Sequence, residues 1–182
     1  IYREKADAVS VLTEEEYFLG RLDYIKIAKE HSARPVLRKD FIFNIYQIYE
    51  SRAAGADAIL LIERLLDTSQ ASEYLHAAKE LGMTVLFEVH DMKGLEKAMC
   101  INAPVIGVNN RDIGAMKTDM ETTFRMKKEI PADRVVVSES GIRTAGDVNR
   151  LEEAGVDAVL IGTACMEARD IKKKMEEMFS KW

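Results

Sequence analysis

Short apolar runs recur at regular intervals along the chain, and stretches with apolar residues three and four apart lie between them. Each run is almost continuously apolar, as expected of a parallel strand that is covered on both faces. The runs occupy residues 8–12, 35–41, 58–63, 85–90, 105–112, 135–141 and 158–163. The intervening helical patterns predict parallel strands that are joined by right-handed crossover helices.

Polar residues stand at or near the carboxyl end of most runs, where a buried strand does not need them. They are Lys39, Glu63, Glu88, Asn109, Glu139 and Thr163. In a closed (β/α) barrel these ends meet at one mouth, which is where such enzymes place their chemistry. A doubly wound open sheet also fits the periodicity, but it would concentrate its site at one switch point. We therefore predict an α/β fold, a (β/α)8 TIM barrel with seven of its eight strands in this chain.

Similar sequences lead into three of the predicted strands: EKADAVSVL at 4–12, AGADAILLI at 54–62 and AGVDAVLIG at 154–162. The Asp of each suits the tight turn from a helix into the next strand. A linker rich in Pro, Gly or Ser does not interrupt the alternation. We expect residues 1–182 to form one barrel domain that is incomplete at its N-terminus, because this fold usually needs about 200 to 250 residues.

Composition and charge exclude several classes of protein. Hydrophobic residues make up 47% of the chain and charged residues 31%, which is typical of a folded globular protein. The formal net charge is −5, with basic residues scattered among acidic ones, so we expect no nucleic-acid partner. The longest apolar runs are strand-sized, so we expect no membrane span. The two cysteines, Cys100 and Cys165, are expected to be buried in a protein of the reducing cytoplasm.

Lys39 and Glu88 are the strongest candidates for acid–base chemistry. Lys39 lies between Leu37 and Phe41 on one face of its predicted strand, where a charged group is costly unless it is paired or functional. Glu88 allows the same two interpretations. Because neighbouring strand ends can hold a Lys and a Glu across a substrate, the two predict an acid–base pair. For Glu63 we favour a structural salt bridge with the adjacent Arg64.

Small residues at the ends of the last two runs indicate a phosphate site. Ser140 with Gly141, and Gly162 with Thr163, place backbone N–H groups where barrels of this class commonly bind phosphate. Either pair alone can serve a tight turn, but their occurrence at consecutive strand ends favours an anion. The polar run 109–112 supplies more hydrogen-bonding groups than a strand end needs. The chain has no metal-ligand spacing, so we predict no metal.

The motifs SVLTEEEYFLG, PVLRKDFIF, LFEVHD, IGVNNRD, VVSESGI and AVLIGT occur in one order, and from about residue 2 to about residue 170 the chain resembles indole-3-glycerol phosphate synthase. The resemblance implies a ribulose-phosphate-binding barrel of tryptophan biosynthesis. Such an enzyme converts 1-(2-carboxyphenylamino)-1-deoxyribulose 5-phosphate to indole-3-glycerol phosphate, with loss of CO2 and water and without a cofactor.

The resemblance also implies a role for each matched position. Lys39 corresponds to an active-site acid and Glu88 to the general base or proton shuttle. The other implied groups are the catalytic Asn109, Glu139 and Ser140, the substrate-positioning Arg111, the apolar ring pocket of Phe18, Phe41 and Ile113, and the phosphate site of Ser140, Gly141, Gly162 and Thr163.

The family's first strand, which carries a second catalytic lysine and a glutamate, has no counterpart in these residues. We therefore expect residues 1–182 alone to be weakly active or inactive. One alternative is a non-catalytic barrel fragment that associates with itself through open strand edges. Another is a different phosphate-binding barrel, such as phosphoribosylanthranilate isomerase or a thiazole-phosphate synthase, but LRKDF and NNRD argue against it.

Overall fold

The computed structural model describes residues 1–112 and 117–180, apart from the side chain of Tyr2. Residues 1–88 together with 97–103 form one compact unit. Residues 89–96 together with 104–182 form a second unit.

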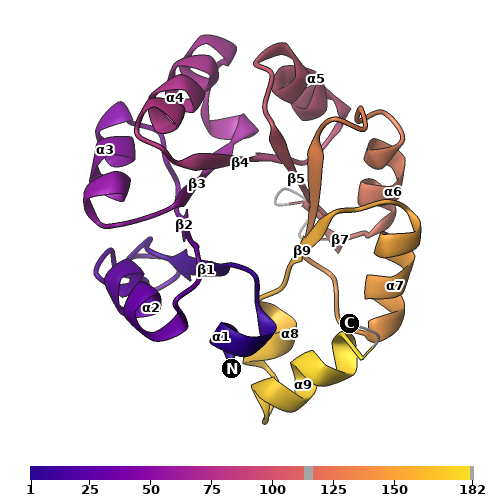
Figure 1. The fold of residues 1–182 in the computed structure, drawn as a ribbon. Coiled ribbons are helices and arrows are strands. Elements are labelled where there is room, and N and C mark those ends of the chain that lie inside the picture. Colours follow the sequence, from indigo (N-terminus) through magenta and orange to yellow (C-terminus); the bar gives the residue numbers. More distant parts are fainter. Residues whose placement is uncertain (113–116, 181–182) are drawn as a thin grey trace. The chain divides into compact units, whose positions relative to one another are not determined.

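The first unit alternates strands with helices. Its strands β1 (Val9–Leu12), β2 (Val36–Lys39), β3 (Ala58–Ile62) and β4 (Thr84–Val89) pair in chain order, each parallel to the next. Its helices are α1 (Tyr2–Lys5), α2 (Tyr24–Ser32), α3 (Ile45–Ala53), the 3-10 helix η1 (Glu63–Leu65) and α4 (Thr68–Glu80), while α5 (Met92–Cys100) crosses into the second unit. Helices α2, α3 and α4 lie on the same side of these strands (Figure 1). The predicted alternation is confirmed here.

The second unit repeats the pattern. Strands β5 (Val105–Asn109), β8 (Val135–Glu139) and β9 (Ala158–Leu160) are parallel neighbours in that order. A short antiparallel pair, β6 (Arg111–Asp112) with β7 (Lys117–Thr118), follows β5. The helices are α6 (Glu121–Lys127), α7 (Ala145–Glu153), α8 (Thr163–Met166) and α9 (Ile171–Met178). The apolar run 105–112 is therefore not one strand, because the ladder with β8 ends at Asn109.

Side-chain caps fix where the helices after several strands begin. Asn44 accepts the N–H of Tyr46 at the start of α3, and Thr144 accepts the N–H of Asp147 at the start of α7. In α4, the carboxylate of Asp67 accepts the N–H of Gln70. Each cap satisfies an N–H group that the first turn of a helix leaves without a partner. The loops between strand ends and helices are thereby held in place.

The sequence predicted that every strand is buried. This holds for β3 and β4 but not for β1 and β9. In β3 and β4 only the first residue of each strand is not buried. In β1, by contrast, only Val11 is buried, and β9 has no buried residue. The expectation that every strand is covered on both faces is wrong for these two, because within the described residues β1 pairs only with β2 and β9 only with β8.

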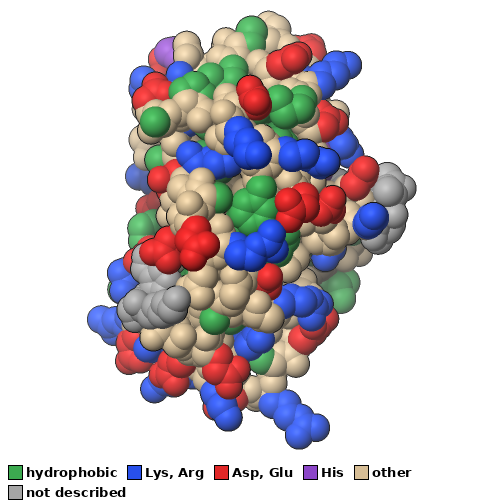
Figure 2. All heavy atoms as spheres, turned by 90° about the vertical axis from the view of Figure 1, so that its right-hand side faces the viewer, with side chains coloured by type: hydrophobic (Ala, Val, Ile, Leu, Met, Phe, Trp, Pro, Cys, Tyr) green, Lys and Arg blue, Asp and Glu red, His purple; other side chains and the backbone are tan. Residues whose placement is uncertain are grey.

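The surface carries both signs of charge. On the face drawn in Figure 2, Lys and Arg side chains are interspersed with Asp and Glu side chains. Within the described ranges, no helix combines the length and the apolar composition that crossing a bilayer requires. Both cysteines are free, and Cys165 is buried as expected. Cys100 is exposed, contrary to the expectation, because it ends α5 on the side away from the buried Ala98 and Leu95.

Candidate active site

Lys39 and Glu88 meet at the ends of β2 and β4. Both strands flank β3, and the Lys39 ammonium nitrogen Nζ lies 3.2 Å from Oε2 of Glu88. The Lys39 side chain is 24% exposed and the Glu88 side chain only 3% exposed. The ammonium group compensates the charge of a carboxylate that is otherwise removed from water. The structural interpretation, an ion pair with a neighbouring carboxylate, is confirmed by this contact, and the acid–base role of the two residues stays a prediction.

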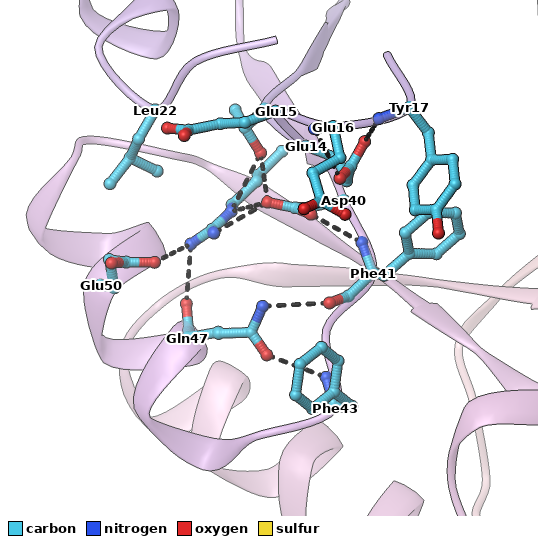
Figure 3. A pocket seen from close by; sticks show the side chains of 12 residues that line it. Glu14, Glu15, Glu16, Tyr17, Leu22, Asp40, Phe41, Phe43, Gln47 and Glu50 are labelled. Carbon is cyan, nitrogen blue, oxygen red and sulfur yellow. Dashed lines mark hydrogen bonds and ion pairs between the residues drawn. The ribbon is translucent and has the colours of Figure 1, made fainter. Parts of the chain in front are cut away.

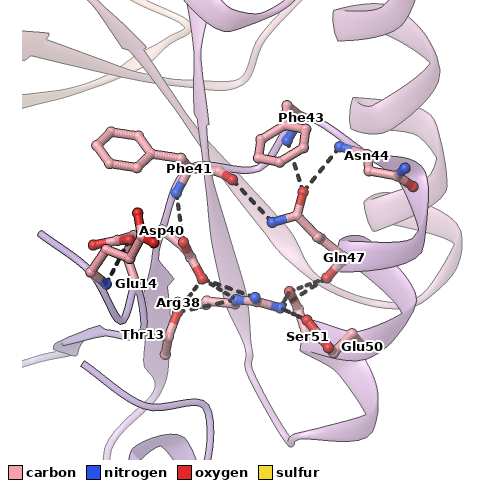
Figure 4. A network of polar contacts seen from close by, with 11 residues as sticks. Thr13, Glu14, Arg38, Asp40, Phe41, Phe43, Asn44, Gln47, Glu50 and Ser51 are labelled. Atoms are coloured by element: carbon pink, nitrogen blue, oxygen red, sulfur yellow. Dashed lines mark hydrogen bonds and ion pairs between the residues drawn. The ribbon is translucent and has the colours of Figure 1, made fainter. Parts of the chain in front are cut away.

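Arg38, on the opposite face of β2, ties the strand to its surroundings (Figure 4). Its guanidinium group donates to the Asp40 carboxylate at 2.9 Å and 3.1 Å and to the hydroxyl of Thr13 at 3.2 Å. Nη1 also donates to three groups of α3: the Gln47 carbonyl, the Glu50 carboxylate and the Ser51 hydroxyl. Only 5% of the Arg38 side chain is exposed. This network fixes the end of β2, where Lys39 stands between Arg38 and Asp40.

The same network extends to the backbone of Phe41. The other carboxylate oxygen of Asp40 accepts the Phe41 N–H at 2.8 Å, and the Gln47 side chain donates to the Phe41 carbonyl at 3.0 Å. Both polar backbone groups of Phe41 are therefore held. Its ring centroid lies 5.8 Å from that of Phe18, with the two planes tilted by 43°. The two rings are thus close enough to contact each other, while their role in a substrate ring pocket stays a prediction. Ile113, the third residue predicted for that pocket, lies outside the described residues.

Glu14 shapes the loop that carries Phe18. Its carboxylate accepts the N–H groups of Glu16, Tyr17 and Phe18 at 2.7 to 3.0 Å. A cavity of about 510 Å³ opens beside this loop (Figure 3). It is lined by Thr13, Glu14, Glu15, Glu16, Tyr17, Leu22, Arg38, Asp40, Phe41, Phe43, Gln47 and Glu50. The cavity shares Phe41 with the ring pair, but Lys39 and Glu88 are not part of its lining.

In the second unit, Asn109 and Glu139 are register partners at the ends of β5 and β8. Glu139 is 1% exposed, and Asn109 is half-buried. The Asn109 side chain accepts the N–H of Arg111 at 3.0 Å, which turns the chain from β5 into β6. Arg111 itself is exposed. The ends of β5 and β8 therefore bring Asn109 and Glu139 side by side, while their catalytic roles stay predictions.

The predicted phosphate residues follow two neighbouring strands of the second unit. Ser140 and Gly141 come directly after β8, and both have positive φ, +68° and +83°. Gly162 and Thr163 follow β9, which pairs with β8 through Glu139 and Leu160. Gly162 and Thr163 are exposed, and a Cβ atom placed on Gly162 would meet no atom within 4 Å. Phosphate binding by these four residues stays a prediction.

Comparison with known proteins decides the family. The family model for indole-3-glycerol phosphate synthase matches residues 1–178. A relative with that name from Dehalococcoides mccartyi is 50% identical over 179 residues, which is 97% of this chain and 69% of the relative. The chain belongs to the indole-3-glycerol phosphate synthase family.

Other members of the indole-3-glycerol phosphate synthase family match along the same stretch. The protein of that name from Acetivibrio thermocellus is 49% identical over 93% of this chain and 65% of its own length. The one from Albidiferax ferrireducens is 46% identical over 96% of this chain and 66% of its own length. The chain thus spans about two thirds of the length of these synthases.

Solved structures with little sequence identity share the fold. The 3-hexulose-6-phosphate synthase of Salmonella typhimurium gives a TM-score of 0.80 at 18% identity, over 96% of this chain and 85% of that one. An orotidine 5'-phosphate decarboxylase from Pyrococcus horikoshii gives 0.74 at 15% identity, over 97% and 89%. The predicted fold class is confirmed: this synthase-family chain has the TIM-barrel fold of the ribulose-phosphate-binding type, with seven parallel strands in its described part.

Several groups of the synthase site escaped the sequence analysis. Period-2 alternation placed Arg38 and Asp40 on the face opposite Lys39, but it did not give their partners. Glu14 lies in a run of three glutamates, a pattern that is more typical of a solvated loop. The prediction for Glu63 is confirmed, since it pairs with Arg64 at 3.2 Å. Among the described residues, no group of three His, Cys, Asp or Glu side chains could hold a metal ion.

Proposed function

We propose that this chain performs the ring closure, decarboxylation and dehydration of 1-(2-carboxyphenylamino)-1-deoxyribulose 5-phosphate, as its family name indicates. The observation that carries the proposal is the contact of 3.2 Å between Lys39 and Glu88 at the ends of two strands. The Phe18 and Phe41 rings supply an apolar surface for the aromatic ring of the substrate. No resident cofactor takes part in the proposed reaction.

The chemistry requires proton transfer at each stage. When the substituted ring carbon attacks the ribulose carbonyl, the carbonyl oxygen takes a proton, for which the Lys39 ammonium is the donor. Loss of CO2 returns its bonding electron pair to the ring and restores aromaticity. The new hydroxyl then leaves as water after a second protonation, while Glu88 removes one proton from the intermediate. Two protons are donated and one is removed, which balances the carboxylate that departs as CO2.

The remaining predicted residues complete this proposal. Asn109, Glu139 and Ser140 join the catalytic group, and Arg111 pairs with the substrate carboxylate, for which a guanidinium group is well suited. Ser140, Gly141, Gly162 and Thr163 bind the phosphate through small side chains and backbone N–H groups. Their support is the place of the two pairs after neighbouring strands of the second unit. We further propose the cytoplasm as the location, supported by two free cysteines.

The roles of Lys39 and Glu88 are tested by Lys39→Met and Glu88→Gln. Because each removes a proton-transfer group, the rate of indole-3-glycerol phosphate formation is expected to fall by about 100-fold or more in each variant. Indole fluorescence under single-turnover conditions, with the protein in excess, makes a slow rate measurable. Lys26→Met, which removes an exposed lysine of α2, is the control and leaves the rate unchanged. Rates within about threefold of the unsubstituted chain in both site variants would refute the assignment.

We also propose that residues 1–182 associate with themselves through the open edge of β1. In the described part of the chain, β1 pairs with β2 alone. The N–H groups of Val9 and Thr13 point to β2, since they donate to Pro35 and Lys39. Peptide groups alternate in direction along a strand, so those of Ser10 and Leu12 point to the open side, where another strand can add.

Ser10→Pro removes the N–H donor on the open side, and edge strands tolerate proline there. Sedimentation velocity is expected to show the unsubstituted chain and the control Ser10→Ala above the monomer mass of 20.6 kDa, and Ser10→Pro at that mass. A monomeric unsubstituted chain at all concentrations would contradict the proposal.

A further inference from the structure

Ser140 adopts a backbone conformation that serine rarely occupies. Its φ is +68°, and the following Gly141 has φ +83°. For an L-residue, the left-handed region is unfavourable because the Cβ atom comes too close to the following carbonyl oxygen. Glycine, which has no Cβ atom, adopts this region freely, whereas serine adopts it only under strain. The surrounding structure must therefore hold Ser140 in place.

The side chain of Asn110 holds Ser140 in place through a hydrogen bond. Its amide nitrogen Nδ2 donates to the carbonyl of Ser140 at 3.0 Å and to the hydroxyl of Ser138 at 3.1 Å. Its amide oxygen accepts the backbone N–H of Thr123 at 3.1 Å and the Thr123 hydroxyl at 2.8 Å. Asn110 is 2% exposed, and both Ser138 and Thr123 are fully buried. Both N–H donors of the Asn110 amide are used, and its oxygen accepts two hydrogen bonds. Among side chains of this size, only Asn offers this combination of donors and acceptor.

The backbone of Asn110 is bonded on both sides as well. Its N–H donates to the carbonyl of Glu139 at 2.9 Å, and its carbonyl accepts the N–H of Asp119 at 2.9 Å. Asp119 follows Thr118, whose Cγ2 would lie only 2.7 Å from a Cβ atom on Gly141. Asn110 thus fixes the turn after β8 and also the segment that packs against it.

We propose that Asn110 is a positioning residue for the turn of Ser140 and Gly141. Its amide holds the Ser140 carbonyl and so keeps the left-handed backbone that presents these two residues to the substrate's phosphate. It acts through Ser140 and not by touching substrate. The inference rests on the proposed function, because that function gives the turn its phosphate role.

The test compares Asn110→Ala with Thr123→Val in the full 182-residue chain. Thr123→Val disturbs the same buried network, but it keeps the Thr123 N–H on the Asn110 oxygen and the Asn110 amide on Ser140. Two quantities are measured by NMR: the one-bond Cα–Hα coupling of Ser140, which falls when φ is positive, and the affinity for inorganic phosphate from titration shifts of the Gly141 amide. Asn110→Asp serves as a second variant in case Asn110→Ala does not fold: it retains an acceptor for Thr123, replaces the two N–H donors by an oxygen and adds a buried carboxyl group.

The proposal expects Asn110→Ala to raise the Ser140 coupling to the value of an ordinary residue and to weaken phosphate binding by about tenfold or more. Thr123→Val is expected to keep both close to those of the unsubstituted chain. Retention of the low coupling and of the affinity in Asn110→Ala, or an equal loss in both variants in proportion to their stability, overturns the proposal. If the unsubstituted chain shows no phosphate shift at Gly141, the proposed phosphate role is wrong, and the Ser140 coupling alone then decides whether Asn110 sets this backbone.

Discussion

Asp57 in the first unit and Asp157 in the second make equivalent hydrogen bonds at the start of a strand. The Asp57 carboxylate accepts the N–H of Val36 at 2.8 Å, and that of Asp157 accepts the N–H of Val136 at 2.8 Å. The backbone N–H of each Asp donates in turn to the carbonyl of the same valine. Each Asp thereby joins the start of its own strand to the start of the preceding one. The repeated text AGADA and AGVDA is explained by this reciprocal contact.

Asp57 also gives a pH-dependent prediction. Burial alone would raise the pKa of Asp57, but hydrogen bonds from Lys29 Nζ at 2.7 Å and from the Val36 N–H, with the charges of Lys29 and Arg52, leave that pKa below its usual value. A lowered pKa in the folded state contributes stability above the unfolded pKa of about 3.9, and the contribution is lost as pH falls through the folded value.

Asp57→Asn is therefore expected to lower the free energy of unfolding at pH 7 by up to about 1 kcal/mol, a modest value because the ion pair is partly exposed and screened. The difference is expected to shrink as pH falls below about 4 and to disappear only below the lowered pKa of folded Asp57. Urea unfolding of both proteins between pH 3 and pH 7 measures it, with Asp23→Asn as a control at an exposed ion pair. A difference that grows as pH falls would contradict this account of Asp57.

At the level of secondary-structure elements, the two faces of β2 make different kinds of contact. Lys39 lies on the face that meets Glu88, while Arg38 connects the strand to α3 and to the segment after β1. The Asp40 side chain is only 9% exposed and forms an ion pair with Arg38 at 2.9 Å. The structural network of Arg38 and the proposed proton-transfer role of Lys39 thus belong to adjacent residues on opposite faces of one strand, as the period of two in a strand allows.

Arg38→Met is expected to lower the free energy of unfolding by about 3 kcal/mol, because it leaves the buried Asp40 carboxylate without its charge partner. The urea midpoint measures this loss. Arg21→Met removes an exposed pair, Arg21 with Asp23, and is expected to cost less than about 1 kcal/mol. Equal costs for the two substitutions would show that burial does not govern the Arg38 network.

The sequence predicted elements better than it predicted contacts between them. Lys39 and Glu88 were found because a charged residue in a buried run is conspicuous by itself. The roles of Arg38 and Asn110 depend on partners such as Glu50 and Thr123, which no periodicity places nearby. The edge strands β1 and β9 were predicted to be fully covered, since an apolar run does not say how many neighbours a strand has.

At the scale of the whole molecule, we expect residues 1–182 to unfold as one domain. All six tyrosines lie within residues 1–88, so tyrosine fluorescence reports the first compact unit, while far-ultraviolet circular dichroism reports helices of both units. A single domain predicts coincident thermal transitions by the two probes. Two separate midpoints would show that the units unfold independently.

We propose that Lys39 and Glu88 carry the chemistry of the indole-3-glycerol phosphate synthase family in this chain. The most direct measurement is single-turnover conversion of 1-(2-carboxyphenylamino)-1-deoxyribulose 5-phosphate by the folded chain, followed by indole fluorescence and by released CO2. We expect one CO2 for each indole formed, at a rate above that of the reaction in buffer and at least about 100-fold lower in Lys39→Met. Product formation no faster than in buffer, or equal rates with and without Lys39, would contradict this proposal.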